Sequence, residues 1–251
     1  MKDRSPLFVG NWKMNKNAAQ THAFFAAFLP LAERIPSKTQ IAIAPPFTAL
    51  ASAAGALHDS TRVALAAQTM SERSDGAFTG EISASMLAEF SVKYVILGHS
   101  ERRTYQHESY IVIAAKLRAA LDAGFTPILA VGESLDLRED GQAISHVLAQ
   151  VHAAIHGLTD AQIARIAVAY EPIWAIGSGL NCDPGEAESV ASKIRGAHRA
   201  LEQSSILYGG SMKPENAAGY LAMPDIDGGL VGGASLDPTA FAQLLEGASR
   251  A

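Results

Sequence analysis

The chain has 251 residues, of which 48% are hydrophobic and 18% charged, so it can bury a sizeable core and is not intrinsically disordered. Its 20 basic and 25 acidic residues give a formal net charge of −5 without a basic run, which argues against a nucleic-acid-binding surface. The single cysteine, Cys182, excludes an intrachain disulfide and argues against a zinc site built from cysteines. We see neither a signal-peptide core at the N-terminus nor an apolar run long enough to span a membrane, and we expect a cytoplasmic protein without a membrane partner.

Short apolar runs alternate with longer amphipathic stretches along the whole chain. Runs that are continuously apolar suit strands that are buried on both faces, as in a parallel sheet. We predict eight such strands: Leu7–Val9, Ile41–Ala44, Val63–Ala67, Val92–Leu97, Thr126–Val131, Ile163–Tyr170, Ile206–Tyr208 and Ile226–Val231.

The amphipathic stretches between these runs predict helices. They are Ala18–Ala32, Ala49–Leu57, Ile82–Phe90, Ile111–Ala123, Ile144–Ile155, Glu186–Leu201, Pro214–Leu221 and Pro238–Glu246. Asp183 and Asp237 each precede a proline, and we expect both to cap a helix whose first residue is that proline. Gly124 is expected to end the helix before it.

Eight strand–helix units of about 31 residues each match the size of a (β/α)8 barrel. A doubly wound sheet is the competing α/β fold, but no Gly-x-Gly-x-x-Gly follows the first predicted strand. No composition shift or Pro/Gly/Ser-rich linker divides the chain, and we expect a single domain over residues 1–251.

The ends of the predicted strands carry the polar residues that could do chemistry. In a barrel, reactive residues belong at the C-terminal ends of the strands. Five strands run into such segments: Gly10-Asn11-Trp12-Lys13, Gly98–Arg103, Glu171–Gly179, Gly209-Gly210-Ser211 and Gly232-Gly233-Ala234-Ser235.

The positions of Glu171 and His99 indicate chemical roles for both side chains but leave structural roles open. Glu171 precedes Pro172, which favours extended backbone and limits where the carboxylate points. His99 precedes a short helix with Ser100 as its cap, and the helix dipole favours a neutral imidazole there. Taken singly, an acid at a strand end is more often an ion-pair partner, and a histidine there makes an ordinary polar contact.

Two further segments look functional from composition alone. Glycines at 177, 232 and 233, together with Ser211, would let backbone N–H groups approach a phosphate dianion, although Gly-Gly pairs are more often mere turns. The mostly apolar stretch that follows Glu171 predicts either a lid over a site or a packed connection. Its residues are Pro172, Ile173, Trp174, Ala175, Ile176, Gly177, Ser178 and Gly179.

Taken together and in order, these segments resemble one known family over essentially the whole chain. The matching stretches are Phe8–Asn15, Gly76–Glu81, Gly98–Arg103, Ala169–Gly177, Tyr208–Ser211 and Val231–Leu236. The resemblance is to the triosephosphate isomerase family, and it implies a TIM barrel. It also implies an aldose–ketose isomerase of glycolysis and gluconeogenesis that needs neither a cofactor nor a metal.

The resemblance implies that dihydroxyacetone phosphate and D-glyceraldehyde 3-phosphate interconvert through a cis-enediolate. Glu171 would be the base and His99 the electrophile, while Lys13 and Asn11 would bind the substrate and stabilise developing charge. Backbone amides near Gly177, Ser211, Gly232 and Gly233 would hold the phosphate.

Other residues would have supporting roles by the same resemblance. Glu101 and Ser100 would support the residues that touch the substrate, and Tyr208 and Ser211 would hold the closed lid. The long loop over residues 68–80, with Thr79 at its tip, would insert into a second subunit of a homodimer.

Some features leave alternatives open. The chain has Thr69, Ala130 and Leu180 where the family usually has asparagine, cysteine and lysine, and none of these changes removes a catalytic group. A related isomerase of a four-carbon ketose phosphate would share every catalytic group and differ in the space near Ile176 and Leu230. A third possible function is that of a phosphate-binding barrel without catalytic activity.

Overall fold

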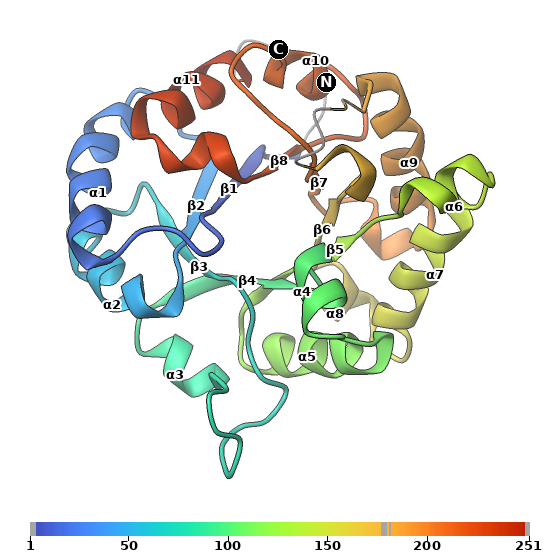
Figure 1. Ribbon diagram of the computed structural model, residues 1–251, viewed down its shortest axis with the longest axis horizontal. Coiled ribbons are helices and arrows are strands. Elements are labelled where there is room, and N and C mark those ends of the chain that lie inside the picture. Colours follow the sequence, from blue (N-terminus) through green and yellow to red (C-terminus); the bar gives the residue numbers. More distant parts are fainter. Residues whose placement is uncertain (1–3, 177–179, 181, 249–251) are drawn as a thin grey trace.

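The structure, a computed structural model, describes residues 4–176, 180 and 182–248. Eight parallel strands pair in chain order and close into a barrel, with helices around the outside (Figure 1). The strands are β1 (Leu7–Asn11), β2 (Gln40–Ala44), β3 (Ala64–Ala67), β4 (Val92–Leu97), β5 (Thr126–Val131), β6 (Ala167–Tyr170), β7 (Ile206–Tyr208) and β8 (Gly228–Val231). The (β/α)8 barrel predicted from the sequence is confirmed.

The helices connect successive strands on the outside of the barrel. The α-helices are α1 (Ala18–Ala32), α2 (Phe47–Ala56), α3 (Ala84–Ala88), α4 (Ser100–Tyr105), α5 (Tyr110–Asp122), α6 (Leu135–Glu139), α7 (Ala143–Ile155), α8 (Asp160–Ile163), α9 (Pro184–Gly196), α10 (Ala217–Leu221) and α11 (Pro238–Ala248). Three 3-10 helices accompany them: η1 (Ile173–Ala175), η2 (Arg199–Leu201) and η3 (Gly233–Leu236).

The strands are mostly apolar because most of their residues are buried on both faces of the sheet. In β2, for example, Ala42 and Ala44 belong to a small apolar cluster, whereas Ile41 and Ile43 belong to a much larger one. The small cluster contains Val9, Ala66, Ile96, Ile128, Ala169 and Leu207, which come from different strands. Since side chains alternate along a strand, the small cluster fills the barrel and the large one packs between barrel and helices.

The predicted helix ends are confirmed where polar caps mark them. The Asp183 carboxylate accepts from the Gly185 N–H at 2.8 Å, and Pro184 is the first residue of α9. The Asp237 carboxylate accepts from two N–H groups of α11. Gly124 has a φ of +86°, as expected just after a helix.

Several predicted boundaries are wrong, for local reasons. The run Ile163–Tyr170 is not one strand, because Thr159 caps the short helix α8 and β6 begins only at Ala167. The stretch Glu186–Leu201 is broken after Gly196 into α9 and η2.

Helix starts also differ from the prediction, and at α4 and α10 the reason is a side-chain hydrogen bond. The cap of α4 is the His99 side chain, so Ser100 is the first helical residue. The helix expected from Pro214 begins at Ala217, because the Asn216 side chain accepts from the Lys213 N–H and holds a turn there.

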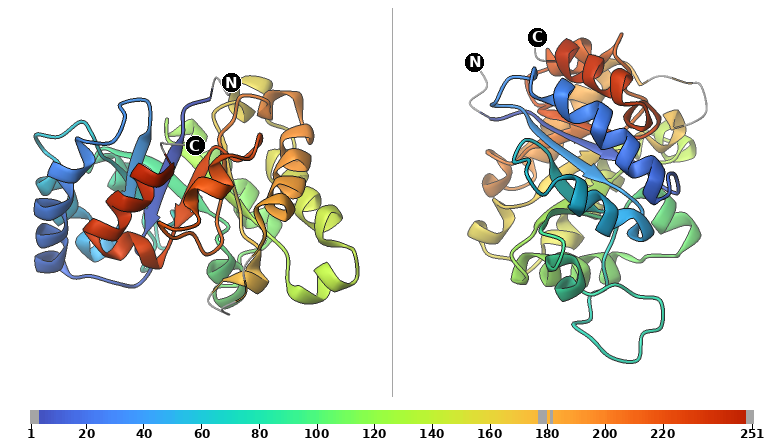
Figure 2. Two further views of the ribbon diagram at one scale, coloured as in Figure 1. Left: turned by 90° about the horizontal axis from the view of Figure 1, so that it is seen from above. Right: turned by 90° about the vertical axis from the view of Figure 1, so that its left-hand side faces the viewer.

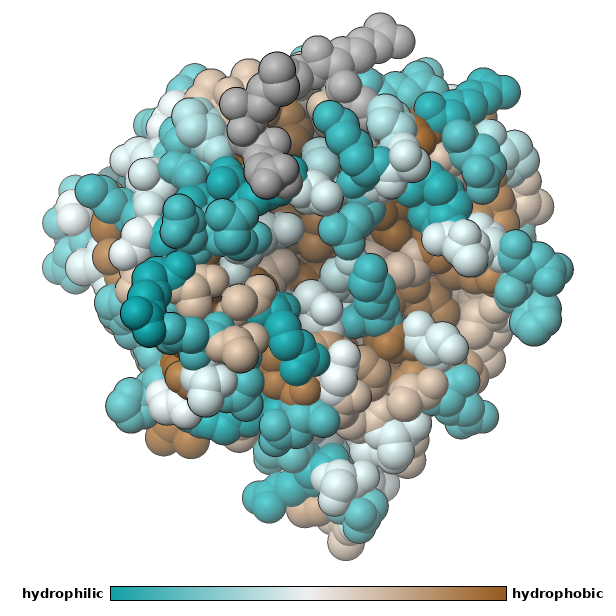
Figure 3. Space-filling view, turned by 180° about the vertical axis from the view of Figure 1, so that it is seen from behind, coloured by the Kyte–Doolittle hydropathy of each residue, from teal (hydrophilic) through white to brown (hydrophobic). Residues whose placement is uncertain are grey.

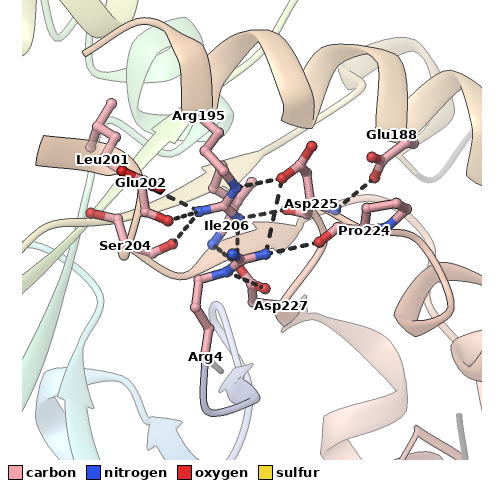
Figure 4. A network of polar contacts seen from close by, with 10 residues as sticks. All are labelled: Arg4, Glu188, Arg195, Leu201, Glu202, Ser204, Ile206, Pro224, Asp225 and Asp227. Atoms are coloured by element: carbon pink, nitrogen blue, oxygen red, sulfur yellow. Dashed lines mark hydrogen bonds and ion pairs between the residues drawn. The ribbon is translucent and has the colours of Figure 1, made fainter. Parts of the chain in front are cut away.

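The seam between β1 and β8 is tied at the starts of the strands by one buried carboxylate (Figure 4). Asp227, whose side chain is fully buried, accepts from Arg4 at 2.9 Å and from Arg195 of α9 at 2.6 Å. It also accepts from the Ile206 N–H at 3.0 Å, at the start of β7. The N-terminal segment, α9, β7 and β8 therefore converge on Asp227.

We predict that Asp227→Asn lowers the free energy of unfolding by about 3–5 kcal/mol, because two arginines lose their shared buried counter-charge. Chemical denaturation of the two proteins measures this difference. Asp160→Asn is the matched control, because Asp160 pairs with a highly exposed Arg199 and an exposed pair contributes at most about 1 kcal/mol. Equal losses in the two variants would contradict the prediction.

Candidate active site

Loops from five strand ends line one cavity of about 630 Å³. In the side view of Figure 2 (left), the green α4 and the gold η1 both lie at the same end of the barrel. They follow β4 and β6. The residues predicted from the sequence that line the cavity are Asn11, Lys13, His99, Glu171, Ile176, Ser211, Leu230, Gly232 and Gly233. The structure therefore brings together segments that are far apart in the sequence.

Glu171, one residue beyond β6, is almost completely buried, at 2% exposed. It lies between two glycines: a side-chain carbon on Gly132 would overlap the Glu171 carbonyl oxygen, and one on Gly209 would lie 2.9 Å from its Cγ. Its Oε2 accepts from the Ser100 N–H at 2.8 Å, and its Oε1 lies 2.9 Å from Nε2 of His99. The carboxylate is thus held at the cavity wall against the start of α4.

The orientation of the His99 ring follows from its place at the cap of α4. Its Nδ1 accepts from the Glu101 N–H at 3.3 Å. Because that nitrogen is an acceptor, a neutral ring carries its proton on Nε2, the nitrogen that faces Glu171. The arrangement gives a hydrogen-bond donor and a carboxylate at the same wall of the cavity.

Lys13 is held in a backbone conformation that is uncommon for a residue with a side chain. Its φ is +51°, in the left-handed region. Gln68 donates to the Lys13 carbonyl at 2.8 Å, and the Asn11 side chain accepts from the Lys13 N–H at 3.1 Å. The Lys13 ammonium forms an ion pair with Glu101 at 2.7 Å, so Glu101 is close to both Lys13 and His99.

The far side of the cavity is formed by the turns after β7 and β8. Ser211, Gly232 and Gly233 lie there as predicted, whereas Gly177 is outside the described residues. Lys213 also lines the cavity and was missed; its position two residues after Gly209-Gly210-Ser211 was the available signal. Backbone amides and a second lysine suit this side of the cavity to an anion.

The first half of the predicted lid is a 3-10 turn anchored by a buried acid. Trp174 donates from its indole to Glu133 at 2.8 Å, and Tyr170 donates to the same oxygen at 3.0 Å. Burial raises the pKa of Glu133. Glu133 was not predicted from the sequence, although it is another acid just beyond a strand. The lid residues Gly177, Ser178 and Gly179 lie outside the described residues.

Tyr208 is buried and stacks on Tyr220, with ring centroids 4.0 Å apart. The two hydroxyls are 3.2 Å apart, and Tyr220 donates to the Cys182 carbonyl. Burial raises the pKa of the Cys182 thiol to about 12, which keeps it protonated and unreactive near neutral pH.

The departures from the family pattern are accommodated locally. Thr69 accepts from the buried Lys116 ammonium at 3.4 Å. Ala130 packs inside the barrel, and its carbonyl accepts from Arg103. Leu180 is half exposed.

The described residues contain neither a candidate metal cluster nor a candidate membrane-spanning helix. Over that part of the chain, no group of three or more His, Cys, Asp or Glu side chains is placed to hold a metal ion. No helix formed by those residues has the length and apolar character needed to cross a membrane. The cytoplasmic location expected from the sequence stays a prediction.

Comparison with known proteins gives one consistent answer. The family model described as triosephosphate isomerase matches residues 6–248. A triosephosphate isomerase of Symbiobacterium thermophilum is 50% identical over 99% of this chain and 98% of that protein. The triosephosphate isomerases of Solibacter usitatus and Streptomyces coelicolor are 46% and 43% identical, over 96% and 98% of this chain and 99% and 98% of those proteins. The chain therefore belongs to the triosephosphate isomerase family.

Proposed function

We propose that the protein is an enzyme that interconverts dihydroxyacetone phosphate and D-glyceraldehyde 3-phosphate. The observation that carries the proposal is the placement of the Glu171 carboxylate 2.9 Å from Nε2 of His99, at the wall of a cavity that Lys13 also lines. A base, a neutral donor and a fixed cation are what proton transfer next to a carbonyl needs. The relatives named triosephosphate isomerase support the same reaction.

In the proposed reaction, Glu171 removes a proton from the carbon next to the substrate carbonyl. The electron pair of that C–H bond forms the C=C bond of a cis-enediolate, while His99 donates from Nε2 to the carbonyl oxygen. Lys13 and Asn11 stabilise the negative charge that develops on oxygen. His99 then transfers a proton between the two substrate oxygens: Nε2 gives its proton to the former carbonyl oxygen and takes the proton of the hydroxyl oxygen, which becomes the new carbonyl. Glu171 returns its proton to the neighbouring carbon, so the isomerisation is completed without a net change in protons.

We propose that Glu101 and Ser100 hold this arrangement from behind. The Ser100 N–H holds one oxygen of Glu171, and Glu101 pairs with Lys13. Substrate phosphate would bind the amides near Ser211, Gly232 and Gly233, with Gly177 contributing from the lid. The lid over residues 172–179 would exclude water while the enediolate exists.

The whole sequence, residues 1–251, would serve this single activity as one domain. Support comes from the barrel, whose first strand starts at Leu7 and whose last strand ends at Val231, and from the family match over residues 6–248.

A coupled assay of the purified protein tests the proposed reaction. With dihydroxyacetone phosphate or D-glyceraldehyde 3-phosphate, we expect turnover that persists after treatment with a chelator. Comparing kcat/KM with that for a four-carbon ketose phosphate distinguishes the two isomerases, because the space near Ile176 and Leu230 limits substrate size. Absence of turnover on all three compounds would support the barrel without catalytic activity and refute the proposal.

We predict that Glu171→Asp lowers kcat by roughly 10²-fold, because a shorter side chain moves the carboxylate by about 1 Å from the reacting carbon. KM should change much less, since the phosphate site is untouched. Glu139→Asp, on the exposed face of α6, is the matched control and should keep full activity. A Glu171→Asp enzyme with unchanged kcat would refute the role of Glu171 as the base.

We also propose that the protein forms a homodimer through the loop over residues 68–80. The described loop extends beyond the outline of the barrel (Figures 1 and 2), and residues 73–81 are all exposed. Phe78 is 45% exposed on this loop, Met14 is 95% exposed beside the cavity segments, and such apolar exposure suits contact with a second copy. On the face seen from behind, hydrophilic and hydrophobic residues are mixed (Figure 3), so that face does not stand out as an apolar interface.

We predict that Phe78→Asp shifts the protein from dimer to monomer, because it places a charge in an apolar contact. Sedimentation velocity at several concentrations measures the change. Leu135→Asp is the control, because Leu135 is exposed to a similar degree on α6 and lies outside the loop. A wild-type protein that stays monomeric, or a Phe78→Asp variant that stays dimeric, would contradict this interface.

A further inference from the structure

A buried glutamine on the outer ring of helices binds both backbone polar groups of one residue just beyond a barrel strand. Gln150 of α7 is only 4% exposed. Its Oε1 accepts from the Gly132 N–H at 2.9 Å, and its Nε2 donates to the Gly132 carbonyl at 3.0 Å. Both polar groups of Gly132 are thus bound by a single side chain, just where β5 has ended.

Gly132 is also in direct contact with the backbone of Glu171. The β5–β6 register pairs Val131 with Tyr170, and the Glu171 N–H donates to the Val131 carbonyl at 2.7 Å. A side-chain carbon built on Gly132 would overlap the carbonyl oxygen of Glu171 and lie 3.2 Å from its Cβ. A displacement of Gly132 would therefore move Glu171, since close-packed backbone has no free space to absorb it.

The Gln150 carboxamide is itself held in one orientation. Its Nε2 lies 2.8 Å from Nε2 of His146, one turn earlier on α7. Burial, together with the charge of Arg103, lowers the pKa of His146, so the ring stays neutral and can accept this hydrogen bond. With one acceptor and two donor positions all in use, the carboxamide cannot turn over without losing its partners.

We propose that Gln150 is a positioning residue for proton transfer. It binds the N–H and the carbonyl of Gly132 and thereby fixes the Glu171 carboxylate opposite His99. The inference rests on the proposed function. The competing explanation is that Gln150 merely ties α7 to β5 and contributes stability alone. The two explanations differ in what happens to kcat in a variant that is still folded.

Gln150→Met keeps the side-chain volume and removes every hydrogen bond to Gly132. We expect kcat to fall roughly tenfold, because Glu171 loses its precise placement, and KM to stay within about twofold, because the turns after β7 and β8 are untouched. Val147→Ala is the matched control: Val147 is buried on the same helix, and the truncation lowers Tm without removing a hydrogen bond to Gly132. We expect Val147→Ala to keep wild-type kcat and KM well below its Tm.

Gln150→Glu is the second variant, and it decides the question if Gln150→Met does not fold. Its carboxylate can still accept from the Gly132 N–H but cannot donate to the Gly132 carbonyl. We expect its kcat to lie between those of wild type and Gln150→Met, or, if only this variant folds, below that of wild type.

A readout that does not need turnover separates this inference from the proposed function. The ¹⁵N NMR signals of the His99 ring report the position of the neighbouring Glu171 carboxylate. We expect them to shift in the Gln150 variants and not in Val147→Ala. If the wild type lacks isomerase activity, the proposed function fails while these signals still test the role of Gln150. A Gln150 variant with a lowered Tm but wild-type His99 signals would overturn the inference, and so would one with wild-type kcat.

Discussion

Closure of the seam between β1 and β8 is the constraint on which the candidate site depends. Lys13 and Asn11 follow the first strand, and Gly232 and Gly233 follow the last, so they share a cavity only because Gly10 pairs with Val231. The Leu7 N–H donates to the Asp227 carbonyl at 3.0 Å where the seam begins. The charges gathered around Asp227 thus lie at one end of the strands and the site at the other.

Fixed partners, rather than net charge, control the electrostatics of the site. The chain is acidic overall, yet Lys13 and Lys213 both line the cavity. The negative groups near them are engaged, Glu101 by the Lys13 ammonium and Glu171 by the Ser100 N–H. Two lysines on one cavity can thus outweigh a modest overall negative charge, and the protein need not be basic to bind the anionic substrate that we propose.

The sequence predicted the fold and the composition of the cavity well because both depend on local patterns. Apolar runs located the strands, and parallel pairing then places every strand end on the same side. The errors at Ile163 and Ser100 have a different origin, since a side-chain cap decides where α8 and α4 begin. Boundaries of this kind depend on one hydrogen bond and leave little periodic signal.

Side-chain contacts between separate elements could not be predicted from the sequence. The hydrogen bonds of Gln68 to the Lys13 carbonyl and of Trp174 to Glu133 join different strand–helix units. The hydrogen bond between Gln150 and Gly132 joins residues 18 positions apart in the chain. No sequence motif around a glutamine indicates such a hydrogen-bond partner. A glycine packed against another backbone segment cannot be distinguished in a sequence from a glycine in a turn. Because these contacts hold residues of the candidate site in place, the sequence predicted which residues line the cavity better than it predicted how they are held.

The slot that holds Glu171 has a consequence for redesign of the enzyme. Gly132 and Gly209 leave no room beside it for even a methyl group, so libraries aimed at new substrates gain little from varying that pair. Ile176 and Leu230 line the same cavity but lie outside the slot, and substitutions there can change the shape of the cavity while the Glu171 carboxylate stays in place.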